Sequence, residues 1–152
     1  MISIKKSHTA DTRTCDVSKV TKEVLLQSSF QHKDDVKAAM TFFSTMLMDA
    51  AAKHDHTKIS HIDEFHSDFK TGFKVTKWWD MHRAVERHHI GQADGVKGDV
   101  DLVDVIEYIA DCVMAGMGRS GSVYPLHLQP ELLEKAFQNT VEKLKAEVVV
   151  EG

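Results

Sequence analysis

The sequence predicts an all-α fold, a single-domain bundle of five or six helices. The chain of 152 residues holds only 8 glycines and 2 prolines, and neither residue type occurs before Gly72. Its apolar residues recur at spacings of three and four, which is the period of an amphipathic helix. No segment indicates a strand. A chain of this length is typical of one compact domain.

The first half of the chain predicts an N-terminal arm and three helices. Residues 1–17 are polar and aperiodic, which indicates an arm or loop. Ser18 can cap a short helix that ends near the Ser28-Ser29 pair. The longest periodic segment covers residues 33–53, and another helix starts near Ser60. The stripe of the long segment consists of Val36, Met40, Phe43, Leu47 and Ala50.

The second half predicts three further helices. They start near Thr76, Asp99 and Pro130. The first ends near His89, the second runs out at Gly116, Gly118 and Gly121, and the third ends near Val148. Thr76 is a suitable cap, and proline is tolerated in the first turn of a helix. The segment 91–98 contains three glycines and is expected to be a loop. The helical domain therefore covers residues 18–148, followed by a tail at 149–152.

The charge of the chain excludes several classes of partner. The formal net charge is −4, and the 19 basic residues are interleaved with 23 acidic ones. Duplex nucleic acid and anionic membrane surfaces are therefore not expected partners.

Cys15 and Cys112 are expected to be reduced. Without an apolar signal segment or a membrane-spanning run, we expect a cytoplasmic protein, for which a homo-oligomer stays open.

Histidine is the unusual entry in the composition, with ten in the chain. One group follows the long helix and consists of His54, His56, His61 and His66. A second group consists of His82, His88 and His89. On a helix, His82, Glu86 and His89 would share one face. For any single histidine the alternative is a side chain that faces water or complements a helix end.

The dipeptide His54-Asp55 lies where the long helix is expected to end. The chain leaves helical geometry there, so both side chains can face one point. Imidazole and carboxylate together suit manganese, iron, cobalt, nickel or zinc, whereas magnesium and calcium sites are normally all oxygen. Together with the residues that follow it and the candidate ligands downstream, the pair indicates a site for one or two divalent transition metal ions.

Asp111 is the single charged residue in an otherwise apolar or small helical stretch. It is expected to be largely buried, and a buried carboxylate costs several kcal/mol unless a cation or several donors accompany it. A pair with Arg87 or Arg119 is the alternative to a metal. Glu107 and Asp104 lie one and two turns earlier, either as groups that support ligands or as a solvated acidic edge. The solvated edge is the expectation for Asp104.

The segment His54-Asp55-His56-Thr57-Lys58 resembles the His-Asp-x-x-Lys signature of the HD-domain metal-dependent phosphohydrolases. Further along, His82, the pair His88-His89 and Ile109-Ala110-Asp111 resemble, in order, the additional ligands of the branch with two or more metals. The run from His32 to Phe137-Gln138-Asn139-Thr140, most of the chain, is similar to a group of mostly uncharacterised phage-encoded HD-like proteins.

The resemblance implies an HD-domain-like bundle with a central metal site. It implies metal ligation by His54, Asp55, His82, His88, His89 and Asp111, and catalytic roles for Asp55, Lys58 and Glu86. Lys58, Arg87 and His32 would contact substrate. The function it implies is hydrolysis of a phosphate ester, first of all a nucleotide, by metal-activated water. The alternatives are a phage-encoded interaction protein with a structural metal and an HD domain that binds a nucleotide without hydrolysing it.

His32 is the candidate for the earlier histidine that HD domains usually carry. A rise of about 1.5 Å per residue would put His32 and His54 roughly 33 Å apart on one straight helix. Either the segment breaks between Thr41 and Asp49, or His32 is not a metal ligand. The unbroken apolar stripe favours the second alternative.

Overall fold

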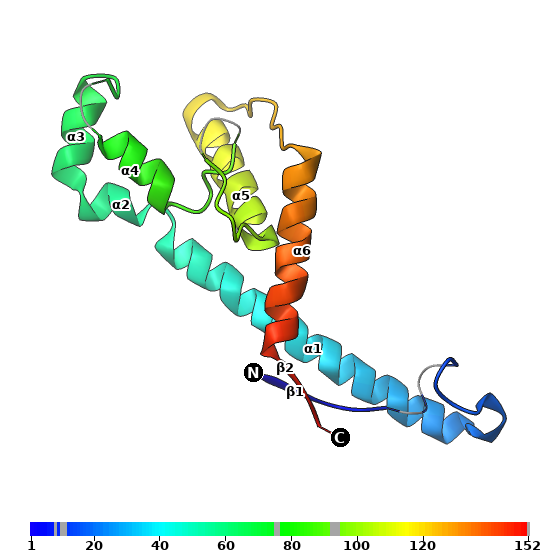
Figure 1. Cartoon of the computed structure of the whole chain (residues 1–152). Helices are drawn as coiled ribbons and strands as arrows, with labels where there is room; N and C mark the ends of the chain where they lie inside the picture. The colour runs from blue at the N-terminus through cyan, green and yellow to red at the C-terminus, as the bar shows by residue number, and fades with distance from the viewer. Residues whose placement is uncertain (8, 10–11, 75–76, 92–94, 152) are drawn as a thin grey trace. The chain divides into compact units, whose positions relative to one another are not determined.

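The computed structural model describes residues 1–7, 9, 12–74, 77–91 and 95–151 (Figure 1). The all-α prediction is confirmed, because helices make up most of the described chain. The elements in order are β1 (Ile2–Lys5), a 3-10 turn (Val17–Lys19), α1 (Lys22–Lys53), α2 (His56–Ser60), α3 (Ile62–Lys70), α4 (Trp78–Val85), α5 (Leu102–Ser120), α6 (Pro130–Glu147) and β2 (Val148–Glu151). No helix in the described ranges has both the length and the apolar character needed to cross a bilayer.

The chain divides into two compact units. The first contains Met1–Thr45 and the residues from Glu142 onward, and the second contains Met46–Val141. The histidine groups predicted to bind metal, including His54, His82 and His88, all belong to the second unit. The site can therefore be described within that unit alone.

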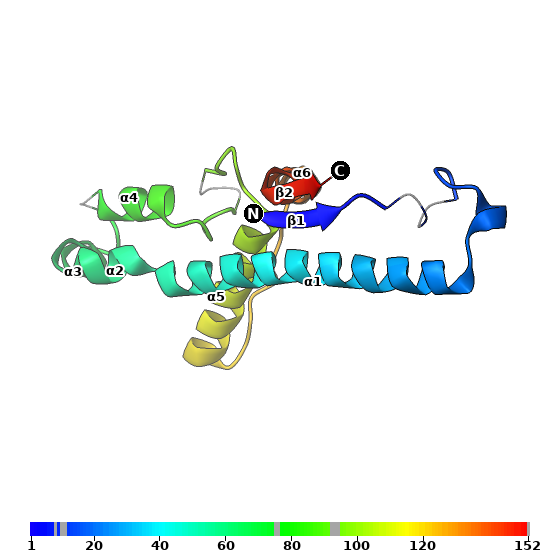
Figure 2. The same cartoon turned by 90° about the horizontal axis from the view of Figure 1, so that it is seen from below.

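The predicted break at Ser28-Ser29 is wrong, because α1 continues through it (Figure 2). The Ser29 hydroxyl donates to the carbonyl oxygen of Leu25 at 2.8 Å, so this polar side chain is satisfied inside the helix. Ser18 also does not cap α1. The Thr21 hydroxyl accepts from the backbone N–H of Val24 at 3.3 Å, which is the capping position that the sequence pattern missed.

The prediction that no segment forms a strand is wrong for the residues of β1 and β2. These strands pair in parallel, with Ile2 opposite Val148 and Lys5 opposite Glu151. The β-branched run Val148-Val149-Val150 favours an extended backbone. The Ser3 hydroxyl adds a hydrogen bond of 2.5 Å to the Glu151 carboxylate.

In the second unit, aromatic packing holds α4 in place. Trp78 is 3% exposed, and its ring stacks on Phe65 and on His82 with centroids 4.3 and 4.7 Å apart. The predicted helix to His89 instead ends at Val85, because Glu86 adopts an extended backbone with ψ 129°. The proposed cap Thr76 lies outside the described residues.

A small apolar core positions α5. Asp101 caps the helix by accepting from the backbone N–H groups of Val103 and Asp104 at 2.8 and 3.1 Å. Thr140 on α6 accepts from the N–H of Leu102 at 2.9 Å, which ties the start of α5 to α6. The buried core cluster consists of Ile90, Val100, Val105, Leu132 and Ala136. The face of α5 that carries Glu107 and Asp111 is fixed by these contacts.

Candidate metal centre

A sharp corner between α1 and α2 presents His54 and Asp55. Asp55 has a left-handed backbone, with φ 56° and ψ 21°. Asp and Asn tolerate this conformation better than most residues. The backbone N–H of Lys58 donates to the Asp55 carbonyl at 2.9 Å and closes the turn. The expectation that the chain leaves helical geometry at His54-Asp55 is confirmed.

The Asp55 carboxylate lies among three imidazole rings. Its Oδ1 is 3.6 Å from His82 Nε2 and 3.7 Å from His88 Nε2. Its Oδ2 is 3.5 Å from His54 Nε2 and also pairs with the Lys58 ammonium group. Burial by itself raises the pKa of Asp55, but the hydrogen bond and charge of Lys58 outweigh burial and lower that pKa. The carboxylate is therefore ionised at neutral pH.

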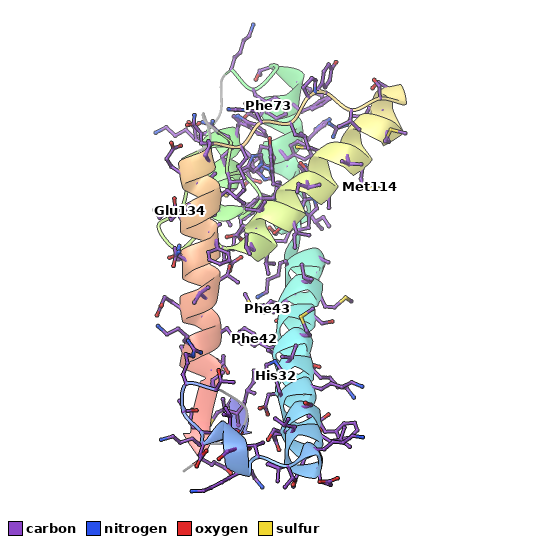
Figure 3. All side chains as sticks on the ribbon, turned by 90° about the vertical axis from the view of Figure 1, so that its right-hand side faces the viewer. His32, Phe42, Phe43, Phe73, Met114 and Glu134 are labelled. Carbon is purple, nitrogen blue, oxygen red and sulfur yellow. The ribbon has the colours of Figure 1, made fainter. Side chains whose placement is uncertain are left out.

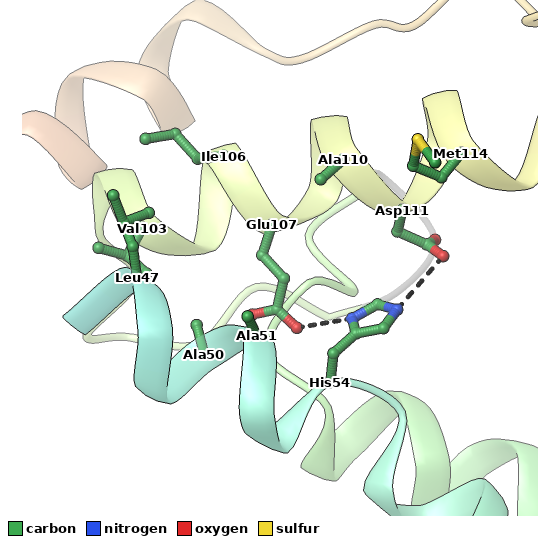
Figure 4. Close-up of a pocket in the computed structure, with 10 residues that line it drawn as sticks. All are labelled: Leu47, Ala50, Ala51, His54, Val103, Ile106, Glu107, Ala110, Asp111 and Met114. Carbon is green, nitrogen blue, oxygen red and sulfur yellow. Dashed lines mark hydrogen bonds and ion pairs between the residues drawn. The ribbon is translucent and has the colours of Figure 1, made fainter. Parts of the chain in front are cut away.

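Two overlapping groups of side chains have the spacing of metal ligands. The first is His82, His88 and His89, and the second is His54, His88 and Asp111. Within each group the candidate ligand atoms lie within 4.8 Å of one another. His54 Nε2 is 3.6 Å from Asp111 Oδ1, on the side of the site shown in Figure 4. The predicted ligands His54, Asp55, His82, His88, His89 and Asp111 thus meet in one region.

Glu107 orients two of these rings. Its Oε1 accepts from His54 Nδ1 at 2.9 Å and from His88 Nδ1 at 3.1 Å (Figure 4 shows the first). Burial by itself raises the pKa of Glu107, but the two histidine hydrogen bonds outweigh it and lower the pKa. With Nδ1–H held in this way, each Nε2 lone pair is left to face Asp55 or a metal ion.

A buried hydroxyl and a buried carboxylate orient the third ring. The Thr57 hydroxyl donates to Glu86 Oε1 at 2.5 Å and accepts from His82 Nδ1 at 2.7 Å. These three residues are 2%, 3% and 0% exposed. Burial is the largest cause that lowers the pKa of His82 to about 4, so this ring is neutral. Glu86, for which the resemblance implies a catalytic role, holds Thr57 and through it His82.

The residues present fit a divalent transition metal ion. Asp55 Oδ1 and His82 Nε2 are buried and have no hydrogen-bond partner among the described residues. Leaving a buried polar atom unsatisfied costs about 1–3 kcal/mol. Two ligands bound at 2.0–2.2 Å in tetrahedral geometry lie about 3.4 Å apart, close to the 3.6 Å between these atoms. A cation between them would satisfy both.

Three expectations about charged residues need correction. The side chain of Asp111 is 29% exposed, so it is not largely buried. Asp104 is not a solvated edge: it is 3% exposed. Arg87 Nε and Nη2 each donate to an Asp104 oxygen at 2.6 Å, and Arg87 also contacts Asp99. This guanidinium therefore holds α5 to the segment after α4, and a substrate role for Arg87 has no support in the geometry.

His32 has no place in this cluster. It lies on α1 several turns before the helix ends, as Figure 3 shows, and α1 has no break between Thr41 and Asp49. The unbroken helix favours the second alternative from the sequence, and neither ligand group contains His32.

Sequence reasoning missed the role of Thr57 and left that of Glu107 open. Thr57 occupies a variable position of the His-Asp-x-x-Lys pattern, and its partners are 25 and 29 residues away. The signal that was available for Glu107 was its place one turn before Asp111, on the same side of α5.

We predict that Thr57→Val weakens metal binding by about 10- to 100-fold, because His82 loses the acceptor that fixes its ring. Isothermal titration with Mn²⁺ or Zn²⁺ measures the effect. Thr57→Ser keeps the hydroxyl and is the matched control, with affinity near that of the wild type. Equal affinities for the valine and serine variants would contradict this role of Thr57.

A scan of protein-family models, a search of curated proteins and a search of solved structures found no match to this chain. The likeness to HD-domain proteins therefore rests on the residues quoted for it.

Proposed function

We propose that this protein is a metal-dependent phosphohydrolase that cleaves a phosphate ester. The observation that carries the proposal is the position of the Asp55 carboxylate among His54, His82 and His88. Glu107 and Thr57 accept from the opposite nitrogen of each ring, which is the usual arrangement behind metal-binding histidines. The likeness of the motif to HD-domain hydrolases makes a nucleotide the first substrate class to test.

A divalent ion bound here would supply a water of lowered pKa as the nucleophile for phosphorus. Asp55 has two oxygens that face different ligand groups, so it is the residue suited to contact two ions. His88 has only Nε2 left for a metal, because its Nδ1 is held by Glu107, so it can serve one ion at a time. Lys58 places a positive charge beside Asp55 Oδ2, where it can neutralise a phosphate oxygen.

Metal analysis combined with an activity screen tests the proposal. The protein is purified without chelator, its bound metals are quantified, and phosphate release from nucleotides and simple phosphate esters is followed with added Mn²⁺ or Co²⁺. We expect at least one equivalent of metal and turnover that stops with EDTA. Stoichiometric metal without turnover of any ester would favour an interaction protein or a non-catalytic binding domain.

Metal affinity is predicted to fall as the pH drops through the pKa of His88. Burial by itself lowers this pKa, but the hydrogen bond to Glu107 and the charges of Asp111 and Asp55 raise it above 6.5. A protonated ring cannot ligate, so the loss begins above pH 6.5, whereas His82 stays neutral until about pH 4. Competition titrations from pH 8 to 5 measure the affinity, and a flat profile would contradict the prediction.

A further inference from the structure

A cavity of about 320 Å³ opens beside the metal ligands, between the last turns of α1 and the face of α5. All of its lining residues belong to the second unit. Figure 4 shows His54 and Asp111 at one end of the cavity and Leu47 and Val103 at the other. The cavity therefore shares His54 and Asp111 with the proposed catalytic centre.

Apart from the end nearest the metal ligands, the cavity wall is apolar. Leu47, Ile106 and Met114 supply aliphatic and thioether groups, and alanines at 50, 51 and 110 keep space between the helices. The polar lining residues are His54, Glu107 and Asp111. Each of these contacts another residue of the cluster: Glu107 Oε1 accepts from two histidines, and Asp111 lies near His54 Nε2.

We propose that this cavity binds the organic part of the substrate and that this part is apolar, such as an aryl or branched alkyl group. The inference rests on the proposed phosphohydrolase function. The apolar wall is the reason for this inference, because transfer of an apolar group from water into an apolar cavity is favourable. A nucleobase carries several donors and acceptors on its edges, and the aliphatic walls offer them no partners.

Charge orients the ester in the site. Glu107 and Asp111 place negative charge beside His54 in the cavity wall, which disfavours an anionic group inside the cavity. Lys58 and the metal ligands lie around Asp55, so the phosphate belongs on that side. The substrate class is thus a phosphate ester with a neutral, apolar alcohol or phenol part.

Substrate comparison with a cavity variant tests the inference. For the wild type, kcat/KM for 1-naphthyl phosphate is expected to be at least tenfold higher than kcat/KM for glycerol 3-phosphate or for thymidine 5′-monophosphate. Ala51→Leu narrows the cavity and is expected to lower kcat/KM for 1-naphthyl phosphate at least tenfold. The same variant is expected to lower kcat/KM for glycerol 3-phosphate less than threefold. Ala52→Leu, the next residue on α1 and not in the wall, is the matched control and should change neither value.

A binding measurement separates failure of this inference from failure of the proposed function. Naphthalene-1-phosphonate is titrated into the metal-loaded wild type, Ala51→Leu and Ala52→Leu, after circular dichroism confirms helix content. If Ala51→Leu weakens phosphonate binding, Ala52→Leu does not, and no ester is hydrolysed, the cavity inference is upheld and the proposed hydrolase function is overturned. Equal turnover of all three esters, unchanged in Ala51→Leu, would overturn the cavity inference and uphold the hydrolase. If the wild type neither binds the phosphonate nor hydrolyses any ester, both the cavity inference and the proposed hydrolase function are overturned.

Discussion

Asp55→Asn is expected to lower metal affinity by at least roughly 100-fold and to abolish metal-dependent phosphate release. Loss of a group that merely supports a ligand costs about 10- to 100-fold, so loss of a carboxylate between three imidazoles should cost at least as much. The distances of 3.5–3.7 Å from its oxygens to His54, His82 and His88 are the basis of this expectation.

Asparagine is the suitable replacement because it keeps the shape of the side chain and tolerates the positive φ of this position. The fold should therefore survive, which circular dichroism and urea unfolding check. Asp63→Asn removes an exposed carboxylate from the first turn of α3 and is the matched control. A variant at Asp55 with full metal content and a rate within threefold of the wild type would end the proposal of a metal centre here.

Arg87→Ala is expected to reduce the free energy of unfolding by about 3 kcal/mol, the lower end of the range for breaking a buried ion pair. The lower end applies because the Arg87 side chain is 37% exposed, although the Asp104 side chain is only 4% exposed. The hydrogen bonds that Arg87 donates to Asp104 are the largest cause that raises the pKa of Arg87. Without the guanidinium, the Asp104 carboxylate would remain buried and lose its cationic partner.

Urea unfolding followed by circular dichroism measures this change. Arg119→Ala is the control, because Arg119 is exposed and such substitutions usually stay within about 0.5 kcal/mol. The same pair of variants tests the role that the sequence assigned to Arg87. Unchanged stability together with a raised KM would mean that Arg87 binds phosphate, contrary to its contacts with Asp104 and Asp99.

Helix positions could be predicted from the sequence because periodicity and capping are local. The predicted terminal helix from Pro130 and the helix that ends near Gly121 agree with α6 and α5. The pairing of β1 with β2 could not be predicted, since it joins residues from opposite ends of the chain. The end of α4 at Val85 was also missed, because no glycine or proline marks it.

The candidate ligands could be predicted from residue type and spacing, although one argument for them was wrong. His82 and His89 do not share a helix, because α4 ends between them, and they meet His88 through the turn that follows. The interactions behind the ligands were beyond sequence reasoning. Whether Glu86 contacts Thr57, or Arg87 contacts Asp104, depends on how separate segments pack.

The parallel strand pair also constrains the order of events during synthesis. β1 is translated well before its partner Val148–Glu151, which follows more than a hundred residues later. Contacts so distant along the chain close slowly. The segment Met46–Val141, which carries the histidine cluster, can therefore begin to organise before the first strand has anything to pair with.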